Sequence, residues 1–220
     1  MRGMAAYIDI PSWPRREAFA YFRGFDKPYF NVCVKLDVAR LKAAVAASGV
    51  GSFNLACHFM ALRLANLHEA FRYRLEDGRV RIHEVVHGGG TVLRDDDSFS
   101  FAYLDHDTDY QRFATQGAAA IAAARSGAAP FDPRLNDDAV IHFTTLPWLH
   151  FSSFSHARNW GREDSVPKIS FGRADVEGSH LWLPFSVEVH HALMDGLHVG
   201  RYVQALEAAL LQPQSWLGLA

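Results

Sequence analysis

The side chains best suited to chemistry gather in one short run near the end of the chain. From His190 to His198 the sequence reads HHALMDGLH, with two adjacent histidines, an aspartate and a third histidine. Histidine can take up and return a proton near neutral pH because its ordinary pKa is about 6.5. The run lies between an apolar segment with the pattern of a strand and an amphipathic segment with the pattern of a helix. Such a junction places side chains at a sheet edge, where functional groups are common.

Three interpretations of this run are open from the residues. In the first, the histidines only end the strand and Asp195 caps the following helix. In the second, His191, Asp195 and His198 bind a metal ion. That spacing requires a continuous helix, which Gly196 and the preceding strand disfavour, and no further ligand cluster has a zinc-site spacing, so no metal is expected. In the third, a histidine acts as general base on a substrate hydroxyl while Asp195 holds the turn.

Helical segments are predicted on both sides of a strand-rich middle. One runs over 39–48, a longer one begins after Ser52, the alanine-rich 118–125 has strong helix propensity, and the last begins near Asp195. This arrangement predicts an α+β fold, in which a mixed, largely antiparallel sheet has helices packed on one face. No linker or repeat divides the sequence, so 1–220 is predicted to be a single domain.

The predicted strands are short apolar or alternating runs bounded by turn residues. Asp77 and Gly78 form a hairpin turn before a strand at 80–86. The triplet Gly88–Gly90 lacks the spacing of a nucleotide-binding loop and predicts a bend or bulge in the sheet. The other predicted strands span 29–37, 90–94, 98–104, 139–146, 149–154, 167–174 and 181–191.

Composition excludes several classes of protein. The chain of 220 residues has 22 basic and 24 acidic side chains, a balance unlike that of a nucleic-acid binder. No stretch approaches the roughly 18 uncharged apolar residues of a membrane span, and Asp9 interrupts any signal-like segment. Cys33 and Cys57 make neither a disulfide framework nor a zinc site. We therefore expect a cytoplasmic protein that binds neither nucleic acid nor membrane.

The run 190–201, HHALMDGLHVGR, resembles the active-site motif of the chloramphenicol acetyltransferase family. HHxxxDG also occurs in peptide-synthetase condensation domains and dihydrolipoyl acyltransferases, but further segments resemble the first family in order and over nearly the whole chain. These segments are 10–17, 67–72 with Asp77 and Gly78, 147–154 and 170–173.

The resemblance implies direct transfer of an acetyl group from acetyl-CoA to a hydroxyl of chloramphenicol. His191 matches the general base, which removes the proton of the hydroxyl and later returns it to the leaving thiolate. Ser153 matches the hydroxyl that donates to the oxyanion of the tetrahedral intermediate. Asp195 matches an aspartate that holds the loop by pairing with an arginine, for which Arg15 is the matching position and Arg16 its neighbour.

The resemblance also implies where the substrates bind. Ser170 and Arg173 stand where the family has a threonine and a lysine near coenzyme A, and arginine also suits a phosphate. A small-molecule acceptor is expected in an aromatic pocket. The matching aromatic residues are Tyr21, Phe22, Phe30 and Phe99. The chain has one HHxxxDG motif, and the resemblance implies that its cleft lies between the subunits of a homotrimer, as in the family.

The segment 155–167 departs from the family, where part of this region lines the acceptor site, and its replacement is more charged. Acetyl transfer is therefore better supported than chloramphenicol as the acceptor. A related acyltransferase acting on another hydroxyl or amine metabolite, or on a carrier-bound acyl group, is the alternative. A non-catalytic binding protein of the same fold is a third hypothesis, which the presence of His191, Asp195 and Ser153 disfavours.

Overall fold

The computed structural model describes residues 5–158 and 164–219. Its strands are β1 (Ala6–Tyr7), β2 (Tyr29–Asp37), β3 (Tyr73–Glu76), β4 (Arg79–Ile82), β5 (His87–Leu93), β6 (Phe99–Leu104), β7 (Val140–Thr145), β8 (Lys168–Phe171), β9 (Asp175–Glu177) and β10 (His180–His190). Its helices are α1 (Arg16–Arg23), α2 (Ala39–Ser48), α3 (Phe53–Leu67), α4 (Tyr110–Ser126), α5 (Gly196–Leu211) and α6 (Pro213–Leu217), with 3₁₀ turns at Ile10–Ser12 and Glu69–Arg72.

One large sheet organises these elements, with strand order β2-β10-β8-β7-β5-β6 and β9 added beside β10. Strand β10 is antiparallel to β2, β8 and β9, and β5 is antiparallel to β6. Strand β7 is parallel to both β5 and β8. The sheet is therefore mixed and largely antiparallel, which confirms the predicted α+β class. A small second sheet, β1-β4-β3, was not predicted.

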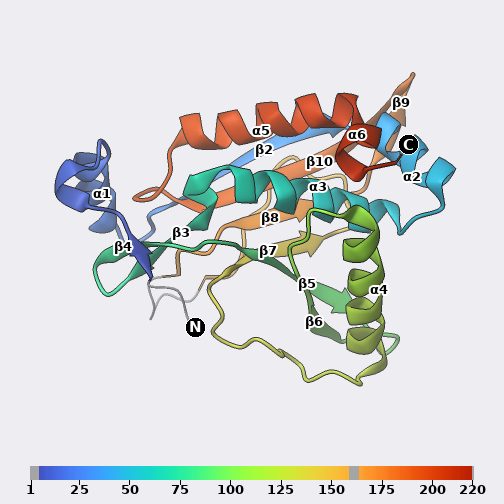
Figure 1. Cartoon of the computed structure of the whole chain (residues 1–220), viewed down its shortest axis with the longest axis horizontal. Coiled ribbons are helices and arrows are strands. Elements are labelled where there is room, and N and C mark those ends of the chain that lie inside the picture. Colours follow the sequence, from blue (N-terminus) through green and yellow to red (C-terminus); the bar gives the residue numbers. More distant parts are fainter. Residues whose placement is uncertain (1–4, 159–163, 220) are drawn as a thin grey trace.

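The long helices cover one face of the large sheet (Figure 1), as predicted, with α4 packed against β5 and β6. Successive side chains of a strand point to opposite faces. On β10, Phe185 and Val187 are buried, and the Phe185 ring lies 6.3 Å from that of Tyr202 on α5. Ser186 and Glu188 alternate with them and therefore point to the face away from the helices, which we call the polar face.

Local capping chemistry explains why the predicted helices are confirmed. The Ser52 hydroxyl accepts a hydrogen bond from the Leu55 amide at the start of α3, and Asp195 caps α5. Gly49 ends α2 in the left-handed conformation that glycine adopts most readily. The helix α1 was not predicted; it has only eight residues, about two turns, and Phe19 is its single buried residue.

The predicted strand at 149–154 is wrong, since this segment is irregular. Phe151 and Phe154 are three residues apart, so they do not alternate as in a strand, and their rings pack 5.7 Å from each other. The backbone of Leu149 instead accepts a hydrogen bond from the Arg173 amide, at 2.7 Å, where the chain leaves the end of the sheet.

The bend predicted at Gly88–Gly90 is also wrong. All three glycines lie within β5 and pair on both sides, with β6 and β7. A Cβ atom at Gly88 would lie 3.1 Å from the ring of Phe143, and one at Gly90 would lie 3.3 Å from its carbonyl oxygen. The glycines thus allow close packing inside a regular strand. The strand predicted at 80–86 ends earlier, at Ile82.

No single helix in the described part of the chain is long and apolar enough to cross a membrane. The pair α2 and α3 passes that test by length and composition, but the two helices are bent by 117° at the break between them.

Candidate active site

The end of β10 and the turn after it fix the backbone of His191. The His191 amide donates to the carbonyl oxygen of Pro28 at 2.6 Å, which ties the turn to the segment before β2. The carbonyl oxygen of His190 accepts hydrogen bonds from the amides of Leu193 and Met194, at 3.0 and 3.1 Å. The turn is therefore closed by backbone hydrogen bonds on both sides of His191.

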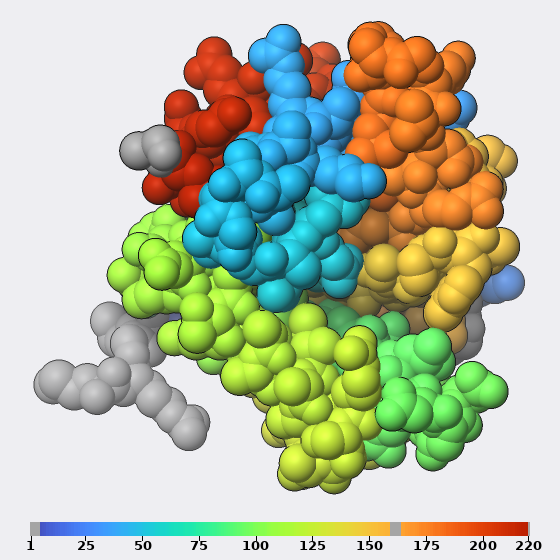
Figure 2. Space-filling view, turned by 90° about the vertical axis from the view of Figure 1, so that its right-hand side faces the viewer, coloured from blue at the N-terminus to red at the C-terminus, as the bar shows by residue number. Residues whose placement is uncertain are grey.

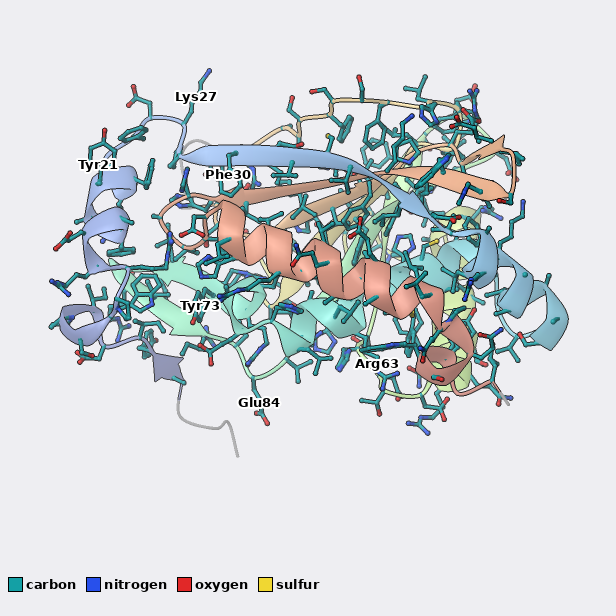
Figure 3. The ribbon with its side chains drawn as sticks, turned by 90° about the horizontal axis from the view of Figure 1, so that it is seen from above. Tyr21, Lys27, Phe30, Arg63, Tyr73 and Glu84 are labelled. Carbon is teal, nitrogen blue, oxygen red and sulfur yellow. The ribbon has the colours of Figure 1, made fainter. Side chains whose placement is uncertain are left out.

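Two aromatic side chains orient the His191 ring. Phe22 of α1 stacks on it with a centroid distance of 3.7 Å and an interplanar angle of 6°, and Phe30 of β2 lies 4.7 Å away. Figure 3 shows α1, with Tyr21, beside the start of β2, with Phe30. The Nδ1 atom of His191 is buried and has no hydrogen-bond partner among the described residues. A substrate therefore has to approach Nε2, and an imidazole with its proton on Nδ1 presents a lone pair there.

An ion pair between Arg15 and Asp195 also holds the turn. Arg15 Nη1 contacts Asp195 Oδ2, and Arg15 Nη2 donates to the carbonyl oxygen of His191 at 3.0 Å. Asp195 Oδ1 accepts from the Leu197 amide, and His198 Nδ1 lies 2.8 Å from it. Partial burial by itself would raise the pKa of Asp195, but the His198 contact and the charges of His198 and Arg15 lower it. The aspartate is therefore ionised and stabilises the turn by its contacts with the Leu197 amide and His198. Arg15 connects it to the backbone of His191.

His190 differs from His191 in both environment and chemistry. Its ring is buried, packs edge-on against Tyr29 at 5.1 Å, and accepts a hydrogen bond from the Ala192 amide at 3.2 Å through Nδ1. Burial, together with the charge of Arg158, lowers the pKa of His190 to about 4. His190 is thus a neutral acceptor within the turn, which leaves His191 as the half-buried histidine available to a substrate.

Ser153 and Ser170 lie on the polar-face side of the molecule. Ser153 is exposed on the irregular segment that follows Leu149. Ser170, on β8, is fully buried, and its hydroxyl lies 3.1 Å from His156 Nε2. A coenzyme could reach the Ser170 hydroxyl only if the segment carrying His156 moved. The proposed role of Ser170 therefore stays a prediction, with this condition attached.

Arg173 lies beyond the end of β8, on an exposed edge. Its guanidinium pairs with both oxygens of Asp175, at 2.9 and 3.3 Å, and His150 Nδ1 approaches the same carboxylate at 3.0 Å. Arg173 and Lys42 both line a cavity of about 440 Å³, together with Asn54 from the first turn of α3. Figure 2 shows the hollowed surface where α2, the start of α3 and the residues around Arg173 meet.

The cavity combines two cations with the N-terminal end of a long helix, which attracts anions. Lys42, Asn54 and Asp175 were not singled out from the sequence. No local pattern could have identified them, because α2, α3 and the β8–β9 connection meet only in the folded chain.

The His191 and Arg173 ends are far apart within one chain. The Gly172 amide donates to the carbonyl oxygen of Pro184, and Asp175 pairs with Trp182, so Arg173 lies beside the N-terminal half of β10. From Pro184 to His191 the extended chain covers about 23 Å. Phe99 belongs with Arg173, because its partner Leu93 extends β5 toward the same end of the sheet.

The predicted aromatic pocket is therefore divided in the single chain. Phe22 and Phe30 contact His191, and Tyr21 packs on Phe22. Phe99 lies on the opposite edge strand, β6, where its ring is 5.5 Å from Phe131. As to metals, no group of three or more His, Cys, Asp or Glu side chains within 5–158 and 164–219 is arranged to hold an ion.

Known proteins are similar to this chain in sequence and in fold. The family model for chloramphenicol acetyltransferase matches residues 4–207. A chloramphenicol acetyltransferase of Streptomyces acrimycini is 32% identical over 215 residues, covering 96% of each chain. One of Escherichia coli is 28% identical over 203 residues, covering 91% of each chain. A solved chloramphenicol acetyltransferase structure is 26% identical, with a TM-score of 0.82, and covers 94% of this chain and 100% of its own. The chain therefore belongs to the chloramphenicol acetyltransferase family and is an acyltransferase.

Proposed function

We propose that the protein transfers the acetyl group of acetyl-CoA to a hydroxyl of chloramphenicol, with His191 as general base. The observation that carries this proposal is the construction of the His191 site. The ring is clamped by Phe22, its Nδ1 is buried, and its backbone is fixed by Pro28 and Arg15. A fixed imidazole with one approachable nitrogen suits proton transfer to and from an attacking oxygen.

In the proposed reaction, His191 Nε2 accepts one proton from the acceptor hydroxyl and later gives it to the leaving sulfur. The imidazole takes the hydroxyl proton as the acceptor oxygen forms a bond to the thioester carbonyl carbon. The carbonyl π electrons move to its oxygen, and the resulting oxyanion accepts a hydrogen bond from the Ser153 hydroxyl. When the intermediate collapses, the carbon–sulfur bond breaks, and the imidazolium gives its proton to the departing sulfur. The products are the acetyl ester and coenzyme A, and His191 returns to its neutral state.

The cavity beside Arg173 is our candidate for the phosphate-bearing end of coenzyme A. Lys42 and Arg173 supply positive charge there, and the N-terminal end of α3 adds the positive end of its helix dipole. The pairing of Arg173 with Asp175 offsets part of this charge. Because Lys42 and Arg173 line the same cavity, the nucleotide is expected at the Arg173 end.

The separation of the two ends supports a homotrimer whose active sites lie between subunits. His191 with Tyr21, Phe22 and Phe30 forms one half of the site in each subunit. The Ser153 segment and the edge with Phe99 and Phe131 form the other half. In the trimer this half would lie against the His191 half of a neighbouring copy. In a closed ring each subunit then gives one half to each neighbour.

The test is release of free thiol from acetyl-CoA on adding chloramphenicol, followed with a thiol reagent. The proposal expects release from the folded wild type and loss of release from His191→Gln. Release that survives in His191→Gln contradicts the mechanism. A panel of other hydroxyl or amine acceptors and longer thioesters is tested in parallel. Thiol release with one of these, but not with chloramphenicol, contradicts chloramphenicol as the acceptor while the protein is still an acyltransferase.

A further inference from the structure

A buried charge pair fastens the segment that carries Ser153 to the polar face of the sheet. Arg158 Nε donates to Glu188 Oε1 at 2.8 Å, and the His156 amide donates to the other oxygen, Oε2, at 3.2 Å. The side chains of Arg158 and Glu188 are only 3% and 6% exposed. One buried carboxylate on β10 therefore holds both the backbone and a side chain of the segment.

Further contacts fix the orientation of the Arg158 guanidinium. Nη1 donates to the carbonyl oxygen of Val166 at 2.9 Å and lies 3.2 Å from Asp164. The guanidinium carbon lies 4.3 Å from the ring centroid of Tyr29. Burial by itself would raise the pKa of Glu188, but the His156 hydrogen bond and the Arg158 charge lower it to about 2. The pair is thus ionised at neutral pH and held on several sides.

Ser153 lies between this fastening and a second one. On its N-terminal side, the amide of Arg173 donates to the carbonyl oxygen of Leu149, and the Leu149 amide donates to Leu146. On its C-terminal side are His156 and Arg158. Ser153 itself is exposed and lies outside any helix or strand. The position of its hydroxyl therefore depends on the two fastenings more than on its own contacts.

We propose that Arg158, acting through Glu188, is a positioning residue that sets the Ser153 hydroxyl for the oxyanion. This inference rests on the proposed function, in which Ser153 donates to that oxyanion. The charges of the 155–158 segment therefore face inward to hold a catalytic segment. A geometric role of this kind affects the transition state, where the hydroxyl bond matters most, and leaves substrate binding nearly unchanged.

A double-mutant cycle separates positioning from general stability. Arg158→Lys keeps the charge but loses the paired geometry of the guanidinium. Arg158→Gln combined with Glu188→Gln removes both charges together, so no lone buried charge is left, and the amide oxygen introduced by Glu188→Gln can still accept from the His156 amide. Each is made in the wild type and in Ser153→Ala. Arg112→Lys, in an exposed ion pair at the start of α4, is the matched control. Near-ultraviolet circular dichroism selects the variants that are folded.

The expected result is a fall in kcat of about 10-fold or more in the wild-type background, with both KM values changed less than about twofold. In the Ser153→Ala background the same substitutions should change kcat by less than about twofold. An equal fall in kcat in both backgrounds overturns the inference. A rise in KM without a fall in kcat overturns it as well. If Ser153→Ala has full activity by itself, the oxyanion role in the proposed function fails, which is a separate outcome.

Discussion

The two ends of strand β10 are built in different ways. At the C-terminal end, His191 is held by contacts from α1, β2, the segment before β2 and Arg15. At the other end, Arg173 is half exposed, and its main ion pair is with Asp175, two residues away. The fold therefore fixes the geometry around His191, and we call this region the built end. The region around Arg173 is exposed to solvent, and we call it the open end.

Exposed aromatic side chains make the same contrast at the edge of the sheet. Phe99 and Phe131 are 46% and 56% exposed, and Trp148, which lines a cavity next to that of Arg173, is 58% exposed. Clustered apolar surface of this kind marks an interaction site. Under the proposed function, the half of the site that carries His191 is fixed within one chain, whereas the half that carries Ser153 and Phe99 is exposed.

The largest expected effect comes from removing the imidazole at the built end. His191→Gln should lower kcat by about 100- to 10,000-fold, because the attacking hydroxyl loses its base. Arg173→Gln, at the open end, should instead raise the KM for acetyl-CoA and leave kcat within a few-fold. Steady-state kinetics on both substrates measure the two effects. A loss of kcat in Arg173→Gln as large as that in His191→Gln would erase the contrast between the ends.

Ser153→Ala should lower kcat on the order of 100-fold, since one hydrogen bond to the oxyanion is lost while both substrates still bind. Ser152→Ala, at the neighbouring exposed serine, is the matched control and should retain activity. Full activity in Ser153→Ala, or an equal loss in Ser152→Ala, would remove Ser153 from the open half of the site.

The built end also predicts a pH dependence of stability. The pKa of His190 is lowered to about 4 in the folded state. Between pH 6.5 and pH 4, His190 therefore binds a proton in the unfolded state but stays neutral in the folded state. This contribution to the free energy of unfolding is present above pH 6.5 and is lost toward pH 4, by at most about 1.4 kcal/mol per pH unit. Urea unfolding at several pH values measures it.

The matched control for this pH effect is the exposed His180, at the opposite end of the same strand. His190→Asn should reduce the slope of stability against pH between 6.5 and 4, although the buried His58 and His142, whose pKa values are also lowered to about 4, keep part of it. His180→Asn should leave most of the slope. Equal slopes in His190→Asn and wild type would show that the turn does not depend on a neutral His190.

The smallest effect is expected from Asp175→Asn at the open end. Releasing Arg173 from its carboxylate should lower the KM for acetyl-CoA by a few-fold, because an exposed ion pair competes only weakly with a phosphate. The 3′-dephospho analogue of acetyl-CoA reports which phosphate Arg173 meets. An unchanged KM for acetyl-CoA at low and high salt would place the coenzyme elsewhere.

Sequence reasoning predicted the features that depend on neighbouring residues. The caps at Ser52 and Asp195, the hairpin at Asp77 and the helix-covered sheet follow from local chemistry and hydrophobic periodicity. It failed at 149–154, where Leu149, Phe151 and Phe154 suggested a strand, whereas the two phenylalanine rings pack on each other in an irregular segment. A short apolar pattern cannot distinguish these cases, because it records which residues are apolar but not what they touch.

Parts of the candidate site were beyond prediction for a related reason. The resemblance indicated His191, Asp195 and Arg15, and the structure brings these three together. It gave no sign of His198 beside Asp195, of Lys42 beside Arg173, or of Arg158 beneath the Ser153 segment. Each of these contacts depends on the exact course of a turn or on two distant segments meeting, and so appears only in the folded chain.

The division of the active site between copies is tested most directly by subunit complementation. His191→Gln and Ser153→Ala chains with different tags are co-expressed, and mixed oligomers are isolated through both tags. If His191 of one copy works with Ser153 of its neighbour, every mixed trimer has about one wild-type site in three. Activity should then rise well above that of either variant. Mixed oligomers no more active than the average of the two variants would contradict a shared site and place both residues in one chain.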